Sequence, residues 1–224
     1  MAARKDRGGK LTVVLRLHGY WRSSTTYRVR IALALKRLDH EIIPVNLLAG
    51  EHRADAFRAC NPFATVPVLE ADGVVHAQSM AILEWLDERF PERRLLPAGI
   101  EDRFAARELA MALATELHAP LNLPVLQYLK LDLGHTQAEV DLWYWHWLER
   151  TLGGVEARLE QRGSGDFLFG APGYFECVAV PQLYNARRNG FDLSAYPQLT
   201  RIDAACAELP EFALSHPDRQ PDAV

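Results

Sequence analysis

The order in which apolar segments follow one another near the start of the chain constrains its fold more than any other feature. The apolar residues predict a strand over 11–17 and, after a polar turn, a helix over about 24–38 with one apolar face. A second short strand is expected over 40–45. This strand, helix and strand predict the start of a small sheet with a helix packed on it.

The next segments extend that sheet. Two apolar runs, 66–70 and 74–77, flank Asp72-Gly73, a dipeptide that favours the two-residue turn of a β-hairpin. An amphipathic helix then follows Ser79 and stops before Pro91. Because all six elements occur in the thioredoxin-like order, we predict a thioredoxin-like α/β domain over 11–91.

Beyond a linker over 92–102, the strand signals disappear. Long apolar-periodic stretches, such as the one over 139–162, predict an all-helical domain over 103–224. That stretch contains Trp143, Trp145 and Trp147, a pattern that is more often core packing than a ligand site. The basic residues 1–10 lack an apolar signal core and are predicted to form a flexible leader.

Composition excludes several classes of function. With 25 basic and 29 acidic side chains, the net charge of −4 gives no reason to expect binding to nucleic acid or a membrane surface. No apolar run approaches the roughly 18–20 residues that cross a bilayer. Cys60, Cys177 and Cys206 are odd in number and widely spaced, so we expect no disulfide framework and a reducing cytoplasm. The scattered histidines predict no metal site.

Four consecutive hydroxyl residues stand between the first strand and the first helix: Ser23, Ser24, Thr25 and Thr26. A single hydroxyl would suffice to cap the helix, so the run fits either capping or a functional turn. A helix N-terminus stabilises an anion, and such surroundings together with a hydroxyl donor depress a thiol pKa. The turn is therefore suited to holding a bound thiolate, although nothing in it supplies one.

Longer runs around these hydroxyls resemble the zeta-class glutathione transferases, a family that includes maleylacetoacetate and maleylpyruvate isomerases. The resemblance covers nearly the whole chain after the leader. It is carried by RSSTTYRVRIALALKRLDHE (22–41), ACNPFATVPVLEADG (59–73), HAQSMAILEWLDERFP (76–91), VAVPQLYNARRNGFDLSAYP (178–197) and SHPDRQPD (215–222). It implies the glutathione transferase fold, with glutathione as cofactor, and a homodimer.

The resemblance also implies roles for individual residues. Ser23 matches the serine that donates to the glutathione sulfur, with Ser24 beside it. Many relatives carry cysteine where this chain has Thr25, so a protein thiol has no role here and either Ser23 or Thr25 could be the thiolate partner. The remaining cofactor-binding positions are Val66-Pro67, which match a cis-proline turn, Gln78-Ser79, which grip the γ-glutamyl end, and His52 near the glycyl end. From the sequence alone, a trans proline at the start of a strand is the commoner expectation for Pro67. Ser79 also stands where a helix N-cap is expected, and a solvent-facing loop histidine is the alternative for His52.

A dicarboxylic substrate should meet basic groups. Arg188 matches the substrate-binding arginine of the family, and Arg22, Arg187 and His118 are further candidates. A solvated or ion-paired role is the alternative for the arginines, and a histidine at the edge of the core is the alternative for His118. In one departure from relatives, Gly173 and Glu176 stand at the start of a helix near Tyr174. Glycine is an acceptable cap and glutamate can reach back, so the helix is expected to form.

The resemblance thus implies glutathione-dependent cis–trans isomerisation of a maleyl-type dicarboxylic acid in aromatic catabolism. Maleylacetoacetate is favoured over maleylpyruvate because some maleylpyruvate isomerases carry paired arginines around the position of Leu123-Pro124. Two alternatives remain. One is a glutathione transferase or dehalogenase acting on small electrophiles, and the other is a non-catalytic glutathione-fold binding protein.

Overall fold

The computed structural model describes residues 4–5, 11–163 and 165–223, and these divide into two compact units. The first unit takes the residues up to 95 together with those from 210 onward, and the second takes 96–209. The expected helical domain over 103–224 therefore differs from the structure at its C-terminal end. Residues from 210 onward pack in the first unit because α10 (Pro210–Ser215) lies against α1 (Ser24–Lys36).

The first unit is built on a mixed four-stranded sheet with the strand order β4-β3-β5-β6. Its strands are β3 (Leu15–Gly19), β4 (Glu41–Pro44), β5 (Val68–Ala71) and β6 (Val74–Ala77). β3 pairs parallel with β4 and antiparallel with β5, and β5 pairs antiparallel with β6. This arrangement confirms the predicted thioredoxin-like sheet and its hairpin.

Local chemistry explains the hairpin and one error at the start of the sheet. Asp72 and Gly73 have φ values of 50° and 85°, as a turn of this type requires, and they connect β5 to β6. The single strand expected over 11–17 is wrong, since β2 (Leu11–Thr12) pairs separately with β1 (Arg4–Lys5). Between β2 and β3, the Val14 amide donates to the Asp72 carboxylate at 3.1 Å. The rest of the expected leader, 1–3 and 6–10, lies outside the described residues.

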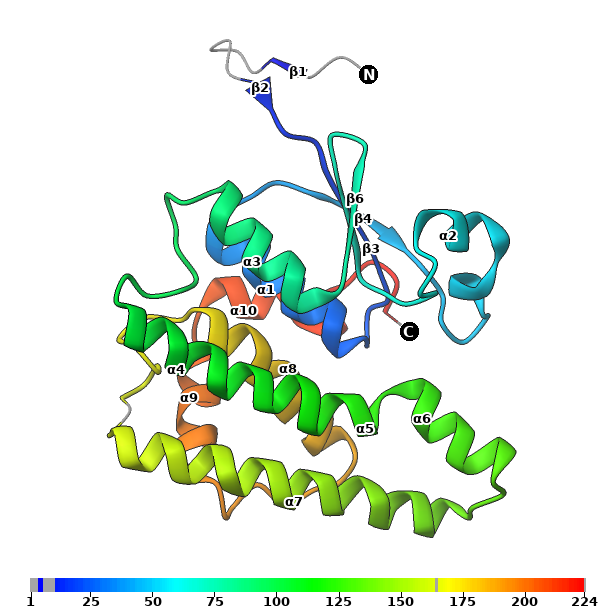
Figure 1. Ribbon diagram of the computed structural model, residues 1–224, viewed down its shortest axis with the longest axis vertical. Helices are drawn as coiled ribbons and strands as arrows, with labels where there is room; N and C mark the ends of the chain where they lie inside the picture. Colours follow the sequence, from blue (N-terminus) through cyan, green and yellow to red (C-terminus); the bar gives the residue numbers. More distant parts are fainter. Residues whose placement is uncertain (1–3, 6–10, 164, 224) are drawn as a thin grey trace. The chain divides into compact units, whose positions relative to one another are not determined.

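Helices cover both faces of the sheet (Figure 1). α1 and α3 (Ser79–Arg89) pack side by side, while η1 (Glu51–Arg53) and α2 (Asp55–Cys60) lie on the other side. Apolar side chains from the sheet and from α1 and α3 form the core. Its fully buried members include Leu17, Val29, Ile31, Leu33, Leu69, Ile82, Leu83 and Leu86.

The described residues of the second unit form helices joined by loops, without a strand, which confirms the predicted all-helical remainder. They are α4 (Ile100–Met111), the π-helix η2 (Ala112–His118), α5 (Ala119–Leu121), α6 (Leu123–Gln127), the π-helix η3 (Tyr128–Asp132), α7 (Gln137–Arg162), α8 (Tyr174–Arg188) and α9 (Pro197–Ala207). η2 packs against α4, α7 and α8. The short η4 (Pro217–Arg219) follows α10 in the first unit.

The expected core role of the three tryptophans on α7 is wrong. Tyr144 and Leu148 are buried, whereas Trp145 is 39% exposed and the other two tryptophans are only half-buried. Residues two apart on a helix point about 200° away from each other, so alternate tryptophans cannot share its buried face. Trp143 instead contacts Trp147 edge-on, with 5.6 Å between ring centroids.

One helical run among the described residues, 100–132, is long and apolar enough to span a bilayer by length and composition. The expectation that no apolar run approaches this length is therefore wrong by this criterion, because the run is apolar on average although scattered polar residues interrupt it. Leu109, Leu113 and Leu117 are nonetheless buried against the neighbouring helices of the second unit. Over the apolar window of this run, 28% is buried.

The start of α8 forms as predicted. Gly173 has no side chain to contribute, and the Glu176 carboxylate reaches back to accept from the Gly173 amide at 2.8 Å and from the Leu168 amide at 2.8 Å. Burial raises the pKa of Glu176, while these backbone donors lower it. The departure from the usual capping pair therefore leaves the helix intact.

Candidate active site

The hydroxyl run forms the N-terminus of α1. Ser23 is the N-cap, and its Oγ accepts from the Thr26 amide at 3.2 Å. No acidic side chain occupies the first turn, so the positive end of the helix is not neutralised there. Ser23 is half-buried, whereas Ser24 and Thr26 are buried within the turn. The capping and functional interpretations are therefore compatible, because Ser23 caps the helix and is only half-buried.

Thr25 links this turn to the loop that precedes β5. Its Oγ1 donates to the Val66 carbonyl oxygen at 3.0 Å and lies 2.9 Å from Ser23 Oγ. The Val66–Pro67 peptide bond is cis, as the family resemblance implied. Because the single Thr25 proton is used by Val66, the contact between the two hydroxyls has Ser23 as its donor. Ser23 is thus the hydroxyl whose proton can be redirected to a ligand.

The start of α3 supplies the third part of the site. Gln78 is the N-cap with a φ of 70° and makes no side-chain capping bond, and Ser79 is the first helical residue. The expectation that Ser79 caps this helix is therefore wrong by one position. The Ser79 Oγ instead accepts from Arg28 Nη1 at 3.2 Å, a bond that joins α3 to α1.

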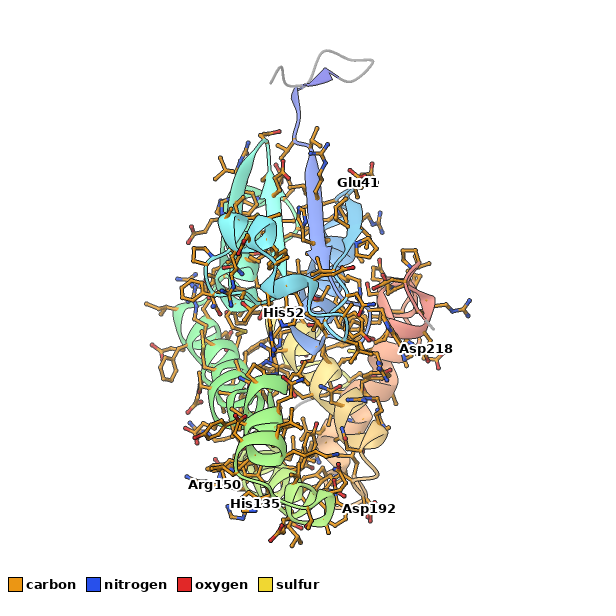
Figure 2. The ribbon with its side chains drawn as sticks, turned by 90° about the vertical axis from the view of Figure 1, so that its right-hand side faces the viewer. Glu41, His52, His135, Arg150, Asp192 and Asp218 are labelled. Carbon is orange, nitrogen blue, oxygen red and sulfur yellow. The ribbon has the colours of Figure 1, made fainter. Side chains whose placement is uncertain are left out.

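His52 lies in η1, in the segment between β4 and α2, where it is labelled in Figure 2. Its side chain is buried at 8% exposure, so the alternative of a solvent-facing loop histidine is wrong. Nε2 lies 3.3 Å from Arg53 Nε, while Nδ1 is buried without a hydrogen-bond partner among the described residues. Burial, and then the Arg53 charge, lower the pKa of His52, which favours the neutral imidazole.

A small apolar cluster holds these segments together. It consists of Tyr20, Trp21, Val45 and Val66, which come from the turn before α1, the end of β4 and the cis-proline loop. Arg22 is half-buried, and its guanidinium stacks over the Trp21 ring at 4.7 Å. Ser23, the cis-proline turn and a basic side chain are therefore brought together within the first unit.

The other basic candidates belong to the second unit. Arg187 is exposed and forms an ion pair of 2.5 Å with Asp203 of α9, so its charge is already partnered. Arg188 is exposed at the end of α8. Burial raises the pKa of Tyr144, and the positive charge of Arg188 partly lowers it. His118 is half-buried at the end of η2.

Two of the protein's three thiols, those of Cys60 and Cys206, are poorly suited to ionise. Burial, and then Glu70, raise the pKa of Cys60. Burial is also the main factor that raises the pKa of Cys206, to which Glu176 and Asp203 add. No group of three or more potential metal ligands occurs among the described residues. Neither Cys60 nor Cys206 is therefore suited to supply a thiolate at the α1 turn.

Two cavities, of about 330 and 270 Å³, lie in the second unit. The first is lined by residues of 162–170 and the second by residues of 129–143, and neither contains a predicted site residue.

Two buried polar residues that support the site were not predicted from the sequence. Arg28 is 1% exposed, and Asn61 is 1% exposed and donates to the Thr65 carbonyl at 2.7 Å. A charged residue on the apolar side of a helix was the available signal for Arg28.

Comparison with known proteins places this site in a family. Residues 22–89 match the model of the glutathione S-transferase N-terminal domain. A probable maleylacetoacetate isomerase of Vibrio cholerae is 41% identical over 210 residues, which cover 92% of this chain and 97% of that protein. Two solved structures are also similar over their full lengths.

One of these is the holo structure of a maleylpyruvate isomerase, a bacterial zeta-class glutathione transferase. It has a TM-score of 0.91 and 38% identity, with coverage of 93% of this chain and 100% of that one. The other is a maleylacetoacetate isomerase of Anaeromyxobacter dehalogenans with glutathione bound in its active site. It has a TM-score of 0.85 and 45% identity, with coverage of 95% and 99%. The chain belongs to the zeta-class glutathione transferases, in the family of maleylacetoacetate and maleylpyruvate isomerases.

Proposed function

We propose that this protein binds glutathione and catalyses the cis–trans isomerisation of a maleyl-type dicarboxylic acid. The observation that carries the proposal is the position of Ser23. Its hydroxyl caps α1 and is linked through Thr25 to the carbonyl of the cis-proline turn. The full-length similarity to isomerases supports this reaction over thioether formation or simple binding.

The residues present fit the parts of glutathione. Ser23, with Ser24 beside it, would face the sulfur, and the Val66-Pro67 turn would meet the peptide part. Gln78 and Ser79 stand at the N-terminus of α3, which favours an anion such as the γ-glutamyl carboxylate. His52 has a buried Nδ1 without a hydrogen-bond partner in the part of the chain that the structure describes, and this atom suits a polar contact with the glycyl end.

When bound, glutathione supplies a thiolate that adds reversibly to the cis double bond and so permits rotation about it. The chain's part is electrostatic. Backbone amides at the α1 N-terminus and the Ser23 hydroxyl would lower the pKa of the bound thiol, and Thr25 would hold that hydroxyl in place.

Basic side chains would bind the two carboxylates of the substrate and stabilise charge that develops beside them. Arg22 adjoins Ser23 directly. Arg188 is the second candidate because its guanidinium is exposed, whereas Arg187 is paired with Asp203. His118 is a further candidate in the second unit. Maleylacetoacetate is the preferred acid in this proposal, because the segment around Leu123-Pro124 lacks the paired arginines of some maleylpyruvate isomerases.

Family membership also supports a homodimer that acts in the cytoplasm in aromatic catabolism. Equilibrium sedimentation of the purified protein would test the dimer. A single sedimenting species with the 25.3 kDa mass of one chain would contradict it.

The activity test uses purified protein with maleylacetoacetate and maleylpyruvate, each with and without glutathione. Conversion to the trans acids that requires glutathione, without its net consumption, is the expected result. Ser23→Ala should lower kcat by roughly a hundredfold, as loss of one charge-stabilising donor does, and affect glutathione binding less. Absence of glutathione-dependent isomerisation of either acid would reject the proposal, and thioether products would favour the transferase.

A further inference from the structure

The C-terminal segment, residues 210–223, folds back on the turn that precedes α1. Arg30 of α1 is 4% exposed and donates from Nε to the Ser215 carbonyl at 2.9 Å and from Nη2 to the Trp21 carbonyl at 3.0 Å. The His216 ring meets Tyr27 edge-on, with 6.2 Å between centroids. This segment was part of the family resemblance in the sequence, and the proposed reaction assigns it no role.

The end of the segment contacts the same turn directly. The Asp222 carboxylate accepts a hydrogen bond from the Trp21 amide at 3.0 Å, across 201 positions of sequence. Ala223 packs on the cluster of Tyr20, Trp21, Val45 and Val66. The backbone N–H of Trp21 is therefore held by Asp222 and its C=O by Arg30, which also binds the segment.

The backbone position of Trp21 affects the geometry of the site. The Ser23 amide donates to the Tyr20 carbonyl at 3.0 Å, so Trp21 and Arg22 lie within one tight turn that ends at the α1 cap. Trp21 is 6% exposed, and a displacement of its backbone would move both the Ser23 hydroxyl and the cluster containing Val66. Positioning errors of about 1 Å are enough to weaken catalysis strongly.

We infer that Asp222 is a positioning residue that holds the Tyr20–Ser23 turn, and through it the Ser23 hydroxyl, in the geometry required by a bound thiolate. The requirement for a bound thiolate rests on the proposed function. Asp222 contacts no reacting group, and its carboxylate acts through the Trp21 amide. The carboxylate suits this task because an ionised acceptor makes a stronger hydrogen bond to an amide than a neutral one does.

The test compares Asp222→Ala with Asp222→Asn, which retains an acceptor oxygen, and with Asp218→Ala as a matched control. Asp218 lies in the same segment (Figure 2), and its side chain is 67% exposed. Amide hydrogen exchange at Trp21 should become about tenfold faster in Asp222→Ala, remain close to wild type in Asp218→Ala, and fall between them in Asp222→Asn. This measurement needs no substrate, so it separates the inference from the proposed isomerase activity.

The second readout is the pKa of the bound glutathione thiol, followed by thiolate absorbance. Asp222→Ala should raise this pKa and raise KM for glutathione more than it lowers kcat, with little change in Tm. A variant that ends at Gln220 also loses Ala223 and should show the larger effect. Unchanged Trp21 exchange in Asp222→Ala, or equal effects from Asp218→Ala, would overturn the inference. If Asp222→Ala fails to fold, unprotected exchange at Trp21 in the wild-type protein would overturn it.

Discussion

Thr25 donates from Oγ1 to the carbonyl oxygen of Val66 at 3.0 Å, which ties the first turn of α1 to the cis-proline loop. The same oxygen lies 2.9 Å from Ser23 Oγ. One side chain therefore fixes both the hydroxyl proposed to face the sulfur and the loop proposed to bind the peptide of glutathione. The sequence allows either Ser23 or Thr25 as the thiolate partner, with Ser23 preferred, and this geometry supports that preference.

Replacing Thr25 tests whether its hydroxyl links α1 to the cis-proline loop and holds Ser23 in place. Thr25→Val removes the donor to Val66 and the acceptor for Ser23, so glutathione should bind about tenfold more weakly. Thr25→Ser retains the hydroxyl and should bind nearly as the wild type does. Isothermal titration with glutathione measures both variants. Equal affinity of Thr25→Val and wild type would show that the link between α1 and the loop is unimportant.

Gly19 is expected to be intolerant of any side chain. A Cβ built at Gly19 would lie 2.2 Å from Thr26 Cγ2 and 3.0 Å from Thr26 Oγ1. Gly19→Ala should therefore lower the free energy of unfolding by about 1–3 kcal/mol, as overpacking typically does. Thr26→Ser removes the clashing methyl group. Urea unfolding of both single variants and the double variant should show that Thr26→Ser recovers much of the loss, whereas simple additivity would contradict the clash.

Lys36 should be among the residues most important for the stability of the first unit. Its ammonium group, with the side chain 1% exposed, bonds the Asp87 carboxylate at 3.0 Å and the carbonyls of Phe90 and Arg93 at 2.9 and 2.7 Å. Lys36→Met leaves the Asp87 carboxylate, whose side chain is 11% exposed, without this counter-charge. The free energy of unfolding should fall by about 3–5 kcal/mol.

The exposed Lys130 offers the matched control. Lys130→Met should change the free energy of unfolding by no more than about 0.5 kcal/mol. Denaturant titration measures both lysine variants. If Lys36→Met and Lys130→Met unfold with comparable free energies, the ion pair between Lys36 and Asp87 contributes little beyond its packing.

The features predicted correctly from the sequence are those set by neighbouring residues. Asp72-Gly73 favours its turn because both residues adopt positive φ, and a hydroxyl at Ser23 caps α1 whatever packs against it. Gly173 and Glu176 likewise interact across three positions. Such interactions depend on local backbone geometry, so a single sequence contains the information needed to predict them.

The features that escaped prediction depend on distant segments. The burial of His52 follows from how η1 packs. The placement of residues from 210 onward depends on two contacts, one between Arg30 and the Ser215 carbonyl and one between the Trp21 amide and Asp222. Arg28 reaches Ser79 across 51 positions. Local periodicity contains no information about such pairs, and the family resemblance pointed to the segments without giving the reason for them.

The lowered pKa of His52 predicts how the free energy of unfolding depends on pH. Burial first, and then Arg53, lower the pKa in the folded protein below the value of 6.5 expected for the unfolded chain. Just below pH 6.5 the unfolded chain therefore binds more protons than the folded protein, so the free energy of unfolding falls as pH decreases. His52→Gln removes this contribution. Between pH 8 and pH 5 the wild type should lose more unfolding free energy than His52→Gln in urea titrations.

Arg53→Met separates the two causes of the His52 shift. Its loss removes the charge that opposes protonation of His52 but leaves most of the burial, so the pH dependence should lie between those of wild type and His52→Gln. Glutathione should add stability at both pH values, because a ligand that binds only the folded protein shifts the unfolding equilibrium. If His52→Gln and wild type lose the same unfolding free energy on acidification, His52 is not held neutral by its burial, and its proposed contact with the glycyl end loses its physical basis.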